Sequence, residues 1–267
     1  MFGAFGISYT LADMTDHAAV ENSIQPNTVL IWIETPSNPS LKVTDIEAIV
    51  SIAKKHNCFT VADNTWATPF YTRPTDLGVD ITLHSTTKYL GGHSDILGGA
   101  LIFKETNERY ERIRAFQKLG GAVPSPYDCW LLCRSLATFA ARMPIHSANA
   151  MQLAQYLEAH PKIERVLYPG LASHPQHTVA AKQMQKGYGG MLSVLVKGDR
   201  AAALQLAGEL KLFTHATSLG GVESLIEHRK SIEGDASPTA DNLLRISVGI
   251  EDIQDLVGDF KQALAKL

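Results

Sequence analysis

Residues 29–63, VLIWIETPSNPSLKVTDIEAIVSIAKKHNCFTVAD, hold a strand, a helix and a second strand in succession. The apolar run at 29–33 is soon followed by two prolines, a pattern typical of a buried parallel strand. From Asp45 onward, apolar residues recur at helical spacing, and aspartate is a common residue at the start of a helix. Residues 59–62 form the next apolar run. This order predicts parallel strands joined by a crossover helix.

The same alternation continues on both sides of this stretch. We expect further strands at residues 6–11, 81–83 and 97–103, and a helix at residues 107–119. Repeated strand–helix–strand units predict an α/β fold with a mostly parallel central sheet that helices cover on both faces.

A different pattern begins near Ser125. Helical periodicity runs from there to His160, and Pro144 predicts a kink or break within it. Beyond it we expect helices at 178–185, 201–210 and 252–267, strands at 191–196 and 243–248, and a surface loop at 228–240. These elements predict a smaller C-terminal α+β domain over residues 135–267, after a first domain over residues 1–134.

Composition narrows the classes of function. The chain has 267 residues, 45% of them apolar, and a formal net charge of −3. That balance provides no basic surface for nucleic acid, and no apolar run approaches the roughly 20 residues that span a membrane. The first ten residues lack the features of a secretory signal. Three cysteines, an odd number, favour a reducing cytoplasmic location over a disulfide scaffold.

Three polar stretches follow predicted strands, namely ETPSNP at 34–39, ADNT at 62–65 and HSTTKYLGGHSD at 84–95. Ligands of α/β sheets bind beyond the carboxyl ends of the strands. Asp63 and Lys88 are 25 residues apart, the length of one crossover. We therefore expect the carboxylate and the amine at one edge of the sheet.

The pair Asp63 and Lys88 has two interpretations at this point. A salt bridge is the ordinary one, since most lysines are solvated charges. Alternatively, Lys88 forms a Schiff base, because a lysine among small polar groups at a strand end suits an amine of lowered pKa. Asp63 would then face the nitrogen of a pyridine ring, and the hydroxyls of Ser85 and Thr87 would donate to a phosphate.

Five motifs occur in the order ETPSNP, VADNTWATP, STTKYLGGHSD, SLGGVESLIEH and LLRISVGIED. They resemble the pyridoxal-phosphate (PLP) enzymes of Cys/Met metabolism, namely cystathionine γ-synthase, γ-lyase and β-lyase, the homoserine sulfhydrylases and methionine γ-lyase. The resemblance runs from end to end of the chain. It implies the fold type I of PLP-dependent transferases, pyridoxal 5′-phosphate as cofactor, an amino-acid substrate and a homotetramer built as a dimer of dimers.

The resemblance also implies a role for each matched residue. Lys88 matches the lysine that holds the cofactor and then moves protons on the substrate. Asp63 matches the carboxylate that keeps the pyridine nitrogen protonated. Ser85 and Thr87 match hydroxyls that bind the cofactor phosphate. Asn38 matches an amide near the ring oxygen of the cofactor and the carboxylate of the substrate.

Residues late in the chain match the substrate site. Arg245, inside an apolar strand, matches the arginine that binds the α-carboxylate of the substrate, and a bidentate guanidinium suits that task. Ser218 matches a residue that lines the same site. Together the matched residues imply PLP-dependent C–S bond chemistry, either β- or γ-elimination or γ-replacement, on sulfur amino acids or activated homoserine.

The sequence departs from the family at positions that bear on the substrate. Thr217 stands where many γ-synthases and γ-lyases carry a glutamate that meets the distal amino group of cystathionine, and threonine cannot supply that charge. Arg229 stands where a proline or small residue often follows the EH pair. Both departures weaken cystathionine as the substrate. They leave open an O-acylhomoserine sulfhydrylase or an enzyme of the methionine γ-lyase type.

Members of the family carry further sequence before the point that matches the first residues of this chain. That part holds a phosphate-binding loop, a tyrosine that stacks on the cofactor and a Tyr/Arg pair lent to the neighbouring subunit. We therefore expect weak cofactor binding, since each lost charge-assisted hydrogen bond is worth about 1.5–3 kcal/mol. The alternatives are a catalytically impaired C-terminal fragment that keeps the fold and oligomer surfaces, and a phosphate-ligand binder without a Schiff base.

Other candidate groups have ordinary explanations. We expect four histidines to be packed or surface residues rather than metal ligands, namely His84, His93, His174 and His177. Residues 92–96, GHSDI, lack the second glycine of a nucleophile elbow. Cys129 and Cys133, four residues apart on a predicted helix, are expected to pack in a core. Trp66 either lines a cofactor cleft or is an ordinary buried aromatic.

Overall fold

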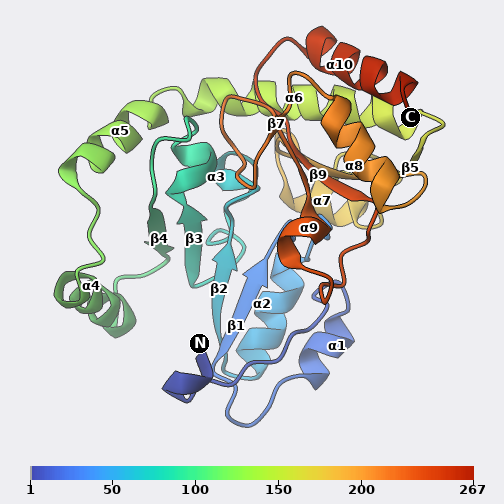
Figure 1. Ribbon diagram of the computed structural model, residues 1–267. Coiled ribbons are helices and arrows are strands. Elements are labelled where there is room, and N and C mark those ends of the chain that lie inside the picture. Colours follow the sequence, from blue (N-terminus) through green and yellow to red (C-terminus); the bar gives the residue numbers. More distant parts are fainter. Residues whose placement is uncertain (1) are drawn as a thin grey trace.

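The computed structural model describes residues 2–267, which form two sheets joined by a long helix (Figure 1). The first sheet has the order β1 (Leu30–Glu34), β2 (Phe59–Asp63), β3 (Ile81–Ser85) and β4 (Gly99–Phe103). β1, β2 and β3 are parallel, as predicted, whereas β4 runs antiparallel to β3. The first sheet is therefore mostly parallel, with one antiparallel edge strand.

The helix predicted after Asp45 is confirmed as α2 (Ile46–Lys55). Asp45 caps it, because its side chain accepts a hydrogen bond of 3.1 Å from the backbone N–H of Ala48. Its apolar face packs in one cluster with Ile31 and Ile33 of β1 and with the short helix α1 (His17–Asn22). The alternate residues of β1, Leu30 and Trp32, are exposed, so helices cover this strand on one face only within the described chain.

The strand predicted at residues 6–11 is wrong. The chain begins with a 3₁₀ helix, η1 (Phe2–Phe5), and continues as irregular structure to residue 13. Residues 6–11 are exposed and pair with no strand within the described chain, and a strand requires a hydrogen-bonded neighbour. Residues 7–15 instead line a groove of about 820 Å³ together with the exposed face of β1.

The long helical pattern of residues 125–160 forms two helices, α5 (Pro126–Leu136) and α6 (Phe139–Glu158). The break lies at residues 137–138, so a break at Pro144 is the wrong prediction. α6 continues through Pro144, which removes one backbone hydrogen bond. The buried face of α6, which includes Met143, Leu153 and Leu157, offsets that loss.

The second sheet has the strand order β5–β6–β9–β8–β7. Its strands are β5 (Ile163–Leu167), β6 (Met191–Val196), β7 (Thr214–His215), β8 (Leu225–His228) and β9 (Leu243–Ser247). The helices of this half are α7 (His177–Gln183), α8 (Arg200–Glu209), α9 (Arg229–Glu233) and α10 (Ile253–Ala265). The sequence predicts β6, β9, α7, α8 and α10, but misses β5, β7 and β8 and assigns α9 to a loop.

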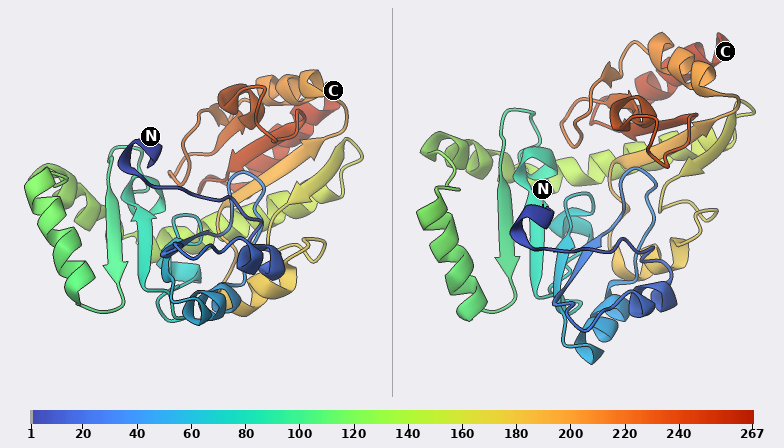
Figure 2. Two further views of the ribbon diagram at one scale, coloured as in Figure 1. Left: turned by 90° about the horizontal axis from the view of Figure 1, so that it is seen from below. Right: turned by 60° about the horizontal axis from the view of Figure 1, so that its bottom comes forward.

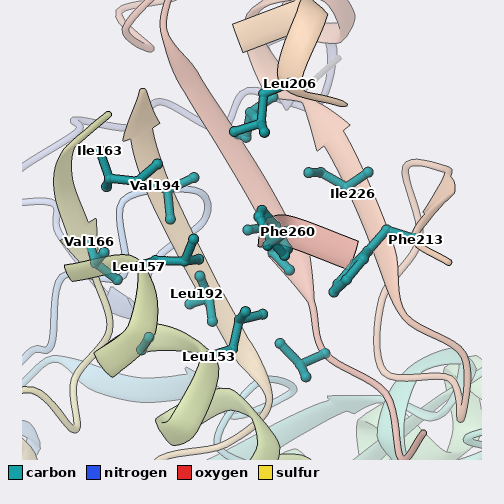
Figure 3. Packing of buried hydrophobic residues seen from close by; sticks show 14 of the residues in the cluster. Leu153, Leu157, Ile163, Val166, Leu192, Val194, Leu206, Phe213, Ile226 and Phe260 are labelled. Atoms are coloured by element: carbon teal, nitrogen blue, oxygen red, sulfur yellow. The ribbon is translucent and has the colours of Figure 1, made fainter. Parts of the chain in front are cut away.

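The largest apolar cluster lies between this second sheet and the helices α6, α8 and α10 (Figure 3). Leu153 and Leu157 of α6 contact the cluster from one side, and Leu192 and Val194 belong to β6. Phe260 of α10 is fully buried among them. Packing of α6 against the second sheet therefore fixes the relation of this sheet to the long helix.

The helix α4 (Glu108–Gly120) and α5 lie beyond β4 at one edge of the molecule, as both views of Figure 2 show. α4 buries none of its residues within the described chain. Cys129 and Cys133 of α5 are exposed, so the prediction that they pack in a core is wrong. Their neighbour Trp130 is also exposed, at 56%. The apolar face of α5 therefore points away from the body of the protein.

None of the helices within residues 2–267 is long and apolar enough to cross a membrane. The first half also contains the short helix α3 (Thr68–Tyr71), which the sequence does not predict. It follows β2 directly and contributes Tyr71, whose ring is buried.

We predict that Phe260→Ala lowers the free energy of unfolding by about 3–5 kcal/mol, because it leaves a cavity in the main apolar cluster. Phe5→Ala removes the same side chain at a site that is 76% exposed, and should change the free energy by less than about 0.5 kcal/mol. Urea unfolding of both variants checks this. Equal effects of the two substitutions would contradict the assignment of this core.

Candidate active site

The carboxyl ends of β1, β2 and β3 meet at one edge of the first sheet, as the parallel register requires. A cavity of about 260 Å³ lies there. Its walls come from both halves of the chain and consist of Glu34, Pro36, Asn38, Asp63, Thr65, Trp66, Ser85, Lys88, Thr217, Leu219, Arg229 and Arg245. Five of the seven predicted site residues therefore line one cavity, although they lie as much as 207 positions apart in the chain.

Lys88 lies in the turn Thr86–Leu90, which follows β3 directly, and its own backbone is not helical (φ −93°, ψ −132°). Its side-chain amine donates a hydrogen bond of 3.4 Å to the hydroxyl of Ser218. Burial lowers the pKa of Lys88, and the positive charge of Arg245 lowers it further, against the opposing effect of Glu227. A larger share of neutral amine is therefore present than on an exposed lysine, which is the form that attacks a carbonyl carbon.

The turn that carries Lys88 is held from two sides. The buried Arg142 of α6 donates to the carbonyl of Tyr89 at 3.0 Å. On the other side Gly220 packs against the same backbone, since a Cβ at this position would lie 2.7 Å from the nitrogen of Tyr89. Gly220 also has a φ of +77°, so glycine is required there for conformation as well as for space.

Asp63 ends β2 and is paired in register with Glu34 at the end of β1. One oxygen of Asp63 accepts a hydrogen bond of 3.0 Å from the backbone N–H of Thr65. The other oxygen, Oδ2, receives no hydrogen bond from residues 2–267, and no ion pair joins Asp63 to Lys88 among these residues. The ordinary salt bridge between Asp63 and Lys88 is therefore not formed.

Glu34 is the register partner of Asp63 and also lines the cavity. Burial raises the pKa of Glu34, and the negative charge of Asp63 raises it further.

The two predicted hydroxyls differ in their surroundings. Ser85 lines the cavity. The hydroxyl of Thr87 accepts a hydrogen bond of 3.0 Å from the backbone N–H of Gly98 and donates one of 3.3 Å to its carbonyl. Thr87 is not part of the cavity wall, so its contact with a phosphate stays a prediction.

Arg245 of β9 is 3% exposed and connects the two halves of the cavity. It donates to the side-chain oxygen of Asn38 at 3.1 Å and to the carbonyl of Thr217 at 2.6 Å. It also forms an ion pair with Glu227, its register partner on β8. Two of the three residues predicted for the substrate-carboxylate site, Arg245 and Asn38, therefore contact each other directly.

Sequence reasoning does not assign Glu34, Glu227 or Thr65 to the site. Glu34 and Glu227 lie inside the motifs ETPSNP and SLGGVESLIEH, so the motifs contain a signal for both. Strand pairing places Glu34 beside Asp63 and Glu227 beside Arg245, and the motifs do not specify this pairing. Trp66 lines the cavity and is 9% exposed, in agreement with the cleft interpretation.

The histidines considered above make backbone contacts or are buried. His174 lies within 3.1 Å of the carbonyl of Leu41, and His177 within 2.9 Å of that of Pro169. His84 is buried. Within the described residues no group of three or more His, Cys, Asp or Glu side chains is placed to hold a metal ion.

The donor set of the cavity fits the cofactor that the sequence resemblance implies. Lys88 offers an amine of lowered pKa for the aldehyde. Oδ2 of Asp63, without a protein donor among residues 2–267, can accept from a protonated ring nitrogen. Ser85 adds one hydroxyl for the phosphate. The amine and the acid therefore match PLP closely, and of the two hydroxyls predicted to bind the phosphate, Ser85 alone lines the cavity within the described residues.

Comparisons with known proteins agree with this fit. The profile of the family described as Cys/Met metabolism PLP-dependent enzyme matches residues 1–265. The chain is 47% identical to cystathionine beta-lyase of Coxiella burnetii and to cystathionine gamma-synthase of Mycobacterium leprae. These matches cover 97% and 99% of the chain and 69% of each relative. Cystathionine gamma-lyase of Dictyostelium discoideum is 44% identical, with 98% of the chain and 69% of that relative covered.

A solved structure is similar along almost the whole chain. The crystal structure of metB from Corynebacterium glutamicum superposes with a TM-score of 0.95 at 44% sequence identity. The superposition covers 99% of this chain and 70% of that one. The fold of the chain is therefore that of a PLP-dependent transferase of fold type I.

We predict that Lys88 is labelled by acetic anhydride with a pH midpoint below the ordinary range of a lysine, because burial and Arg245 favour the neutral amine. Arg245→Gln should move the midpoint of Lys88 upward, since it removes the positive charge, while Arg245→Lys should keep it low. Mass spectrometry of labelled peptides over a pH series measures both. A midpoint of Lys88 in the ordinary range of a lysine, or one that Arg245→Gln leaves unchanged, would refute the prediction.

Proposed function

Because the chain belongs to the Cys/Met metabolism PLP-dependent enzyme family, we propose that the cavity at the edge of the first sheet is its active site, with Lys88 as the residue that binds the cofactor. The protein is a PLP-dependent enzyme of Cys/Met metabolism. One observation carries the assignment of residues. An amine of lowered pKa, a carboxylate with a free oxygen and a buried arginine line the same small cavity.

PLP, when bound, supplies an aldehyde that combines with amines and a ring that withdraws electrons from the carbon next to the amine. In our proposal the amine of Lys88 takes the proton from Cα of the substrate and returns it at Cα or Cβ. Ser218, 3.4 Å from this amine, accepts its hydrogen bond and fixes its direction. Asp63 holds the proton of the ring nitrogen through its free oxygen.

Arg245 and Asn38 bind the α-carboxylate of the substrate in this proposal. The guanidinium of Arg245 is fixed by Asn38, Glu227 and the carbonyl of Thr217, so it does not have to be ordered when substrate binds. Trp66 forms an apolar part of the wall and excludes water from the reacting atoms. Ser85 and, after rearrangement of its contact with Gly98, Thr87 bind the phosphate.

The reaction class is C–S bond chemistry, by β- or γ-elimination or γ-replacement, on a sulfur amino acid or an activated homoserine. The printed names of the relatives, cystathionine beta-lyase, gamma-synthase and gamma-lyase, span this range. A second candidate is an O-acylhomoserine sulfhydrylase or a methionine γ-lyase-type enzyme. The neutral side chain of Thr217 in the cavity wall favours it, because this position offers no carboxylate to a distal amine.

A further candidate is a catalytically impaired form that keeps the fold and the oligomer surfaces. It is supported by the phosphate end of the cavity, where Thr87 is bonded to Gly98 and Ser85 is the single predicted hydroxyl in the wall. Such a site would bind PLP weakly, since phosphate contacts supply much of the affinity for phosphorylated cofactors.

We also propose the division of the chain into residues 1–134 and 135–267, and a cytoplasmic location. The division is supported by the break between α5 and α6, and by two of the three clusters of buried residues, which lie one in each half; the third cluster joins the halves. The cytoplasmic location is supported by three free cysteines.

A homo-oligomer, built as a dimer of dimers, is the assembly that we propose. The arm formed by α4 and α5 exposes large apolar side chains, and Phe116, Leu119 and Trp130 are 74%, 85% and 56% exposed. Exposed apolar side chains on an arm that projects from the body are typical of an interaction surface.

We expect the purified chain to turn yellow on addition of PLP, and borohydride to fix the cofactor on the peptide that contains Lys88. Lys88→Ala should abolish both the colour and the adduct, while Lys197→Ala, at an exposed site, should change neither. Absorbance titration and peptide mass spectrometry measure them, and the titration midpoint reports the affinity. Cofactor fixed on another lysine, or colour that persists in Lys88→Ala, would overturn the assignment.

Trp130→Glu should shift the protein toward smaller assemblies, because it places a charge in the apolar surface of the arm. Leu204→Glu on α8 makes the same kind of change at a residue that is 44% exposed and remote from the arm. It should leave the mass of the assembly unchanged. Sedimentation velocity distinguishes the two. A wild-type chain that sediments as a monomer would contradict the proposed assembly.

A further inference from the structure

Arg229 is a second arginine in the wall of the active-site cavity. It is the first residue of α9, which follows β8 directly and lies near the carboxyl end of β1 in Figure 1. Its side chain is only 20% exposed. A partly buried guanidinium that lines a cavity is available to an anion in that cavity.

Two carboxylates hold this guanidinium in place. Nη1 of Arg229 donates to Glu227 at 3.2 Å, and Nε donates to Glu233 at 2.6 Å. Glu233 is itself fixed, because its second oxygen accepts a hydrogen bond of 2.6 Å from Thr239. Neither glutamate belongs to the cavity wall, and Nη2 of Arg229 has no hydrogen-bond partner among residues 2–267. The guanidinium is therefore positioned from behind.

Arg229 and Arg245 are neighbours, because both contact the same oxygen, Oε1 of Glu227. Their side of the cavity comes from the second sheet and α9, while Glu34 and Asp63 come from the first sheet. One wall of the cavity therefore carries two guanidinium groups, and the wall formed by the first sheet carries two carboxylates. A substrate with two separate carboxylates matches the first of these walls.

We propose that Arg229 binds a second carboxylate of the substrate, so that the enzyme prefers amino acids whose side chain ends in a carboxylate. This rests on the proposed function, in which Arg245 binds the α-carboxylate. The neutral Thr217 in the same wall is consistent with it, since it adds no negative charge that would repel such a group. A charge-assisted hydrogen bond to a carboxylate gives roughly a 10- to 100-fold preference.

Binding of two unreactive amino acids tests this directly. L-2-aminoadipate carries a terminal carboxylate where L-norleucine has a methyl group, and both are titrated calorimetrically into the PLP-saturated chain. We expect aminoadipate to bind roughly 10- to 100-fold more tightly. Arg229→Gln should remove the preference, and Arg229→Lys should keep part of it. Arg165→Gln, at an exposed arginine of β5, is the matched control and should retain it.

Glu233→Gln provides a variant that keeps Arg229 and removes a charge that competes for it. We expect this variant to bind aminoadipate more tightly than the wild type does, because Arg229 then pairs with one carboxylate fewer. If Arg229 has a purely structural role, Glu233→Gln leaves the preference for aminoadipate over norleucine unchanged or reduces it. An equal affinity of the wild type for the two amino acids, or no binding of aminoadipate, overturns the proposal. So does a preference that survives Arg229→Gln.

Turnover separates this inference from the proposed function. O-succinyl-L-homoserine has a terminal carboxylate and O-acetyl-L-homoserine has none, so kcat/KM should favour the succinyl ester in the wild type and not in Arg229→Gln. If both esters react equally well and aminoadipate is not preferred, the proposed function stands and the inference fails. If aminoadipate is preferred through Arg229 but no sulfur amino acid or ester reacts, the inference stands and the proposed function fails.

Discussion

The buried guanidinium of Arg245 is the contact on which the cavity depends. It joins Asn38, in the loop that follows β1, to Glu227 on β8, so one side chain connects the first half of the cavity to the second sheet. A charge at 3% exposure is costly unless it is paired and hydrogen-bonded, and Arg245 satisfies both conditions. The same charge lowers the pKa of Lys88. Arg245 therefore connects the two halves of the cavity and also adds to the effect of burial, which is the larger cause of the lowered pKa of Lys88.

The elements that local pattern controls were predictable. The strands β1 to β3 and the helix α2 follow from apolar periodicity and a capping aspartate. The antiparallel direction of β4 was not predicted. Parallel strands require a crossover helix between them, but segment 86–98 carries the lysine turn instead. The cysteines of α5 were assigned to a core wrongly, since an apolar helix face looks the same in sequence whether the protein itself or a partner covers it.

The site was predictable as far as the carboxyl ends of parallel strands determine it. Asp63 and Lys88 meet at one edge because β2 and β3 are neighbours, and the motifs supplied their chemistry. Glu227 was missed because its position depends on the register between β8 and β9, which places it opposite Arg245. The contact of Thr87 with Gly98 was also beyond prediction, since a hydroxyl forms hydrogen bonds with backbone and ligand alike.

The cavity separates two tasks by their place in the fold. In the proposed function the first sheet carries the groups that act on the cofactor, Asp63 and Lys88, on strand ends whose register is fixed by pairing. The second sheet and α9 carry the arginines that recognise carboxylates, Arg245 and Arg229. Arg229 begins a short helix at the end of an inner strand, so a change there alters which substrates fit without moving the lysine. A family with one chemistry and several substrates is the expected result of this arrangement.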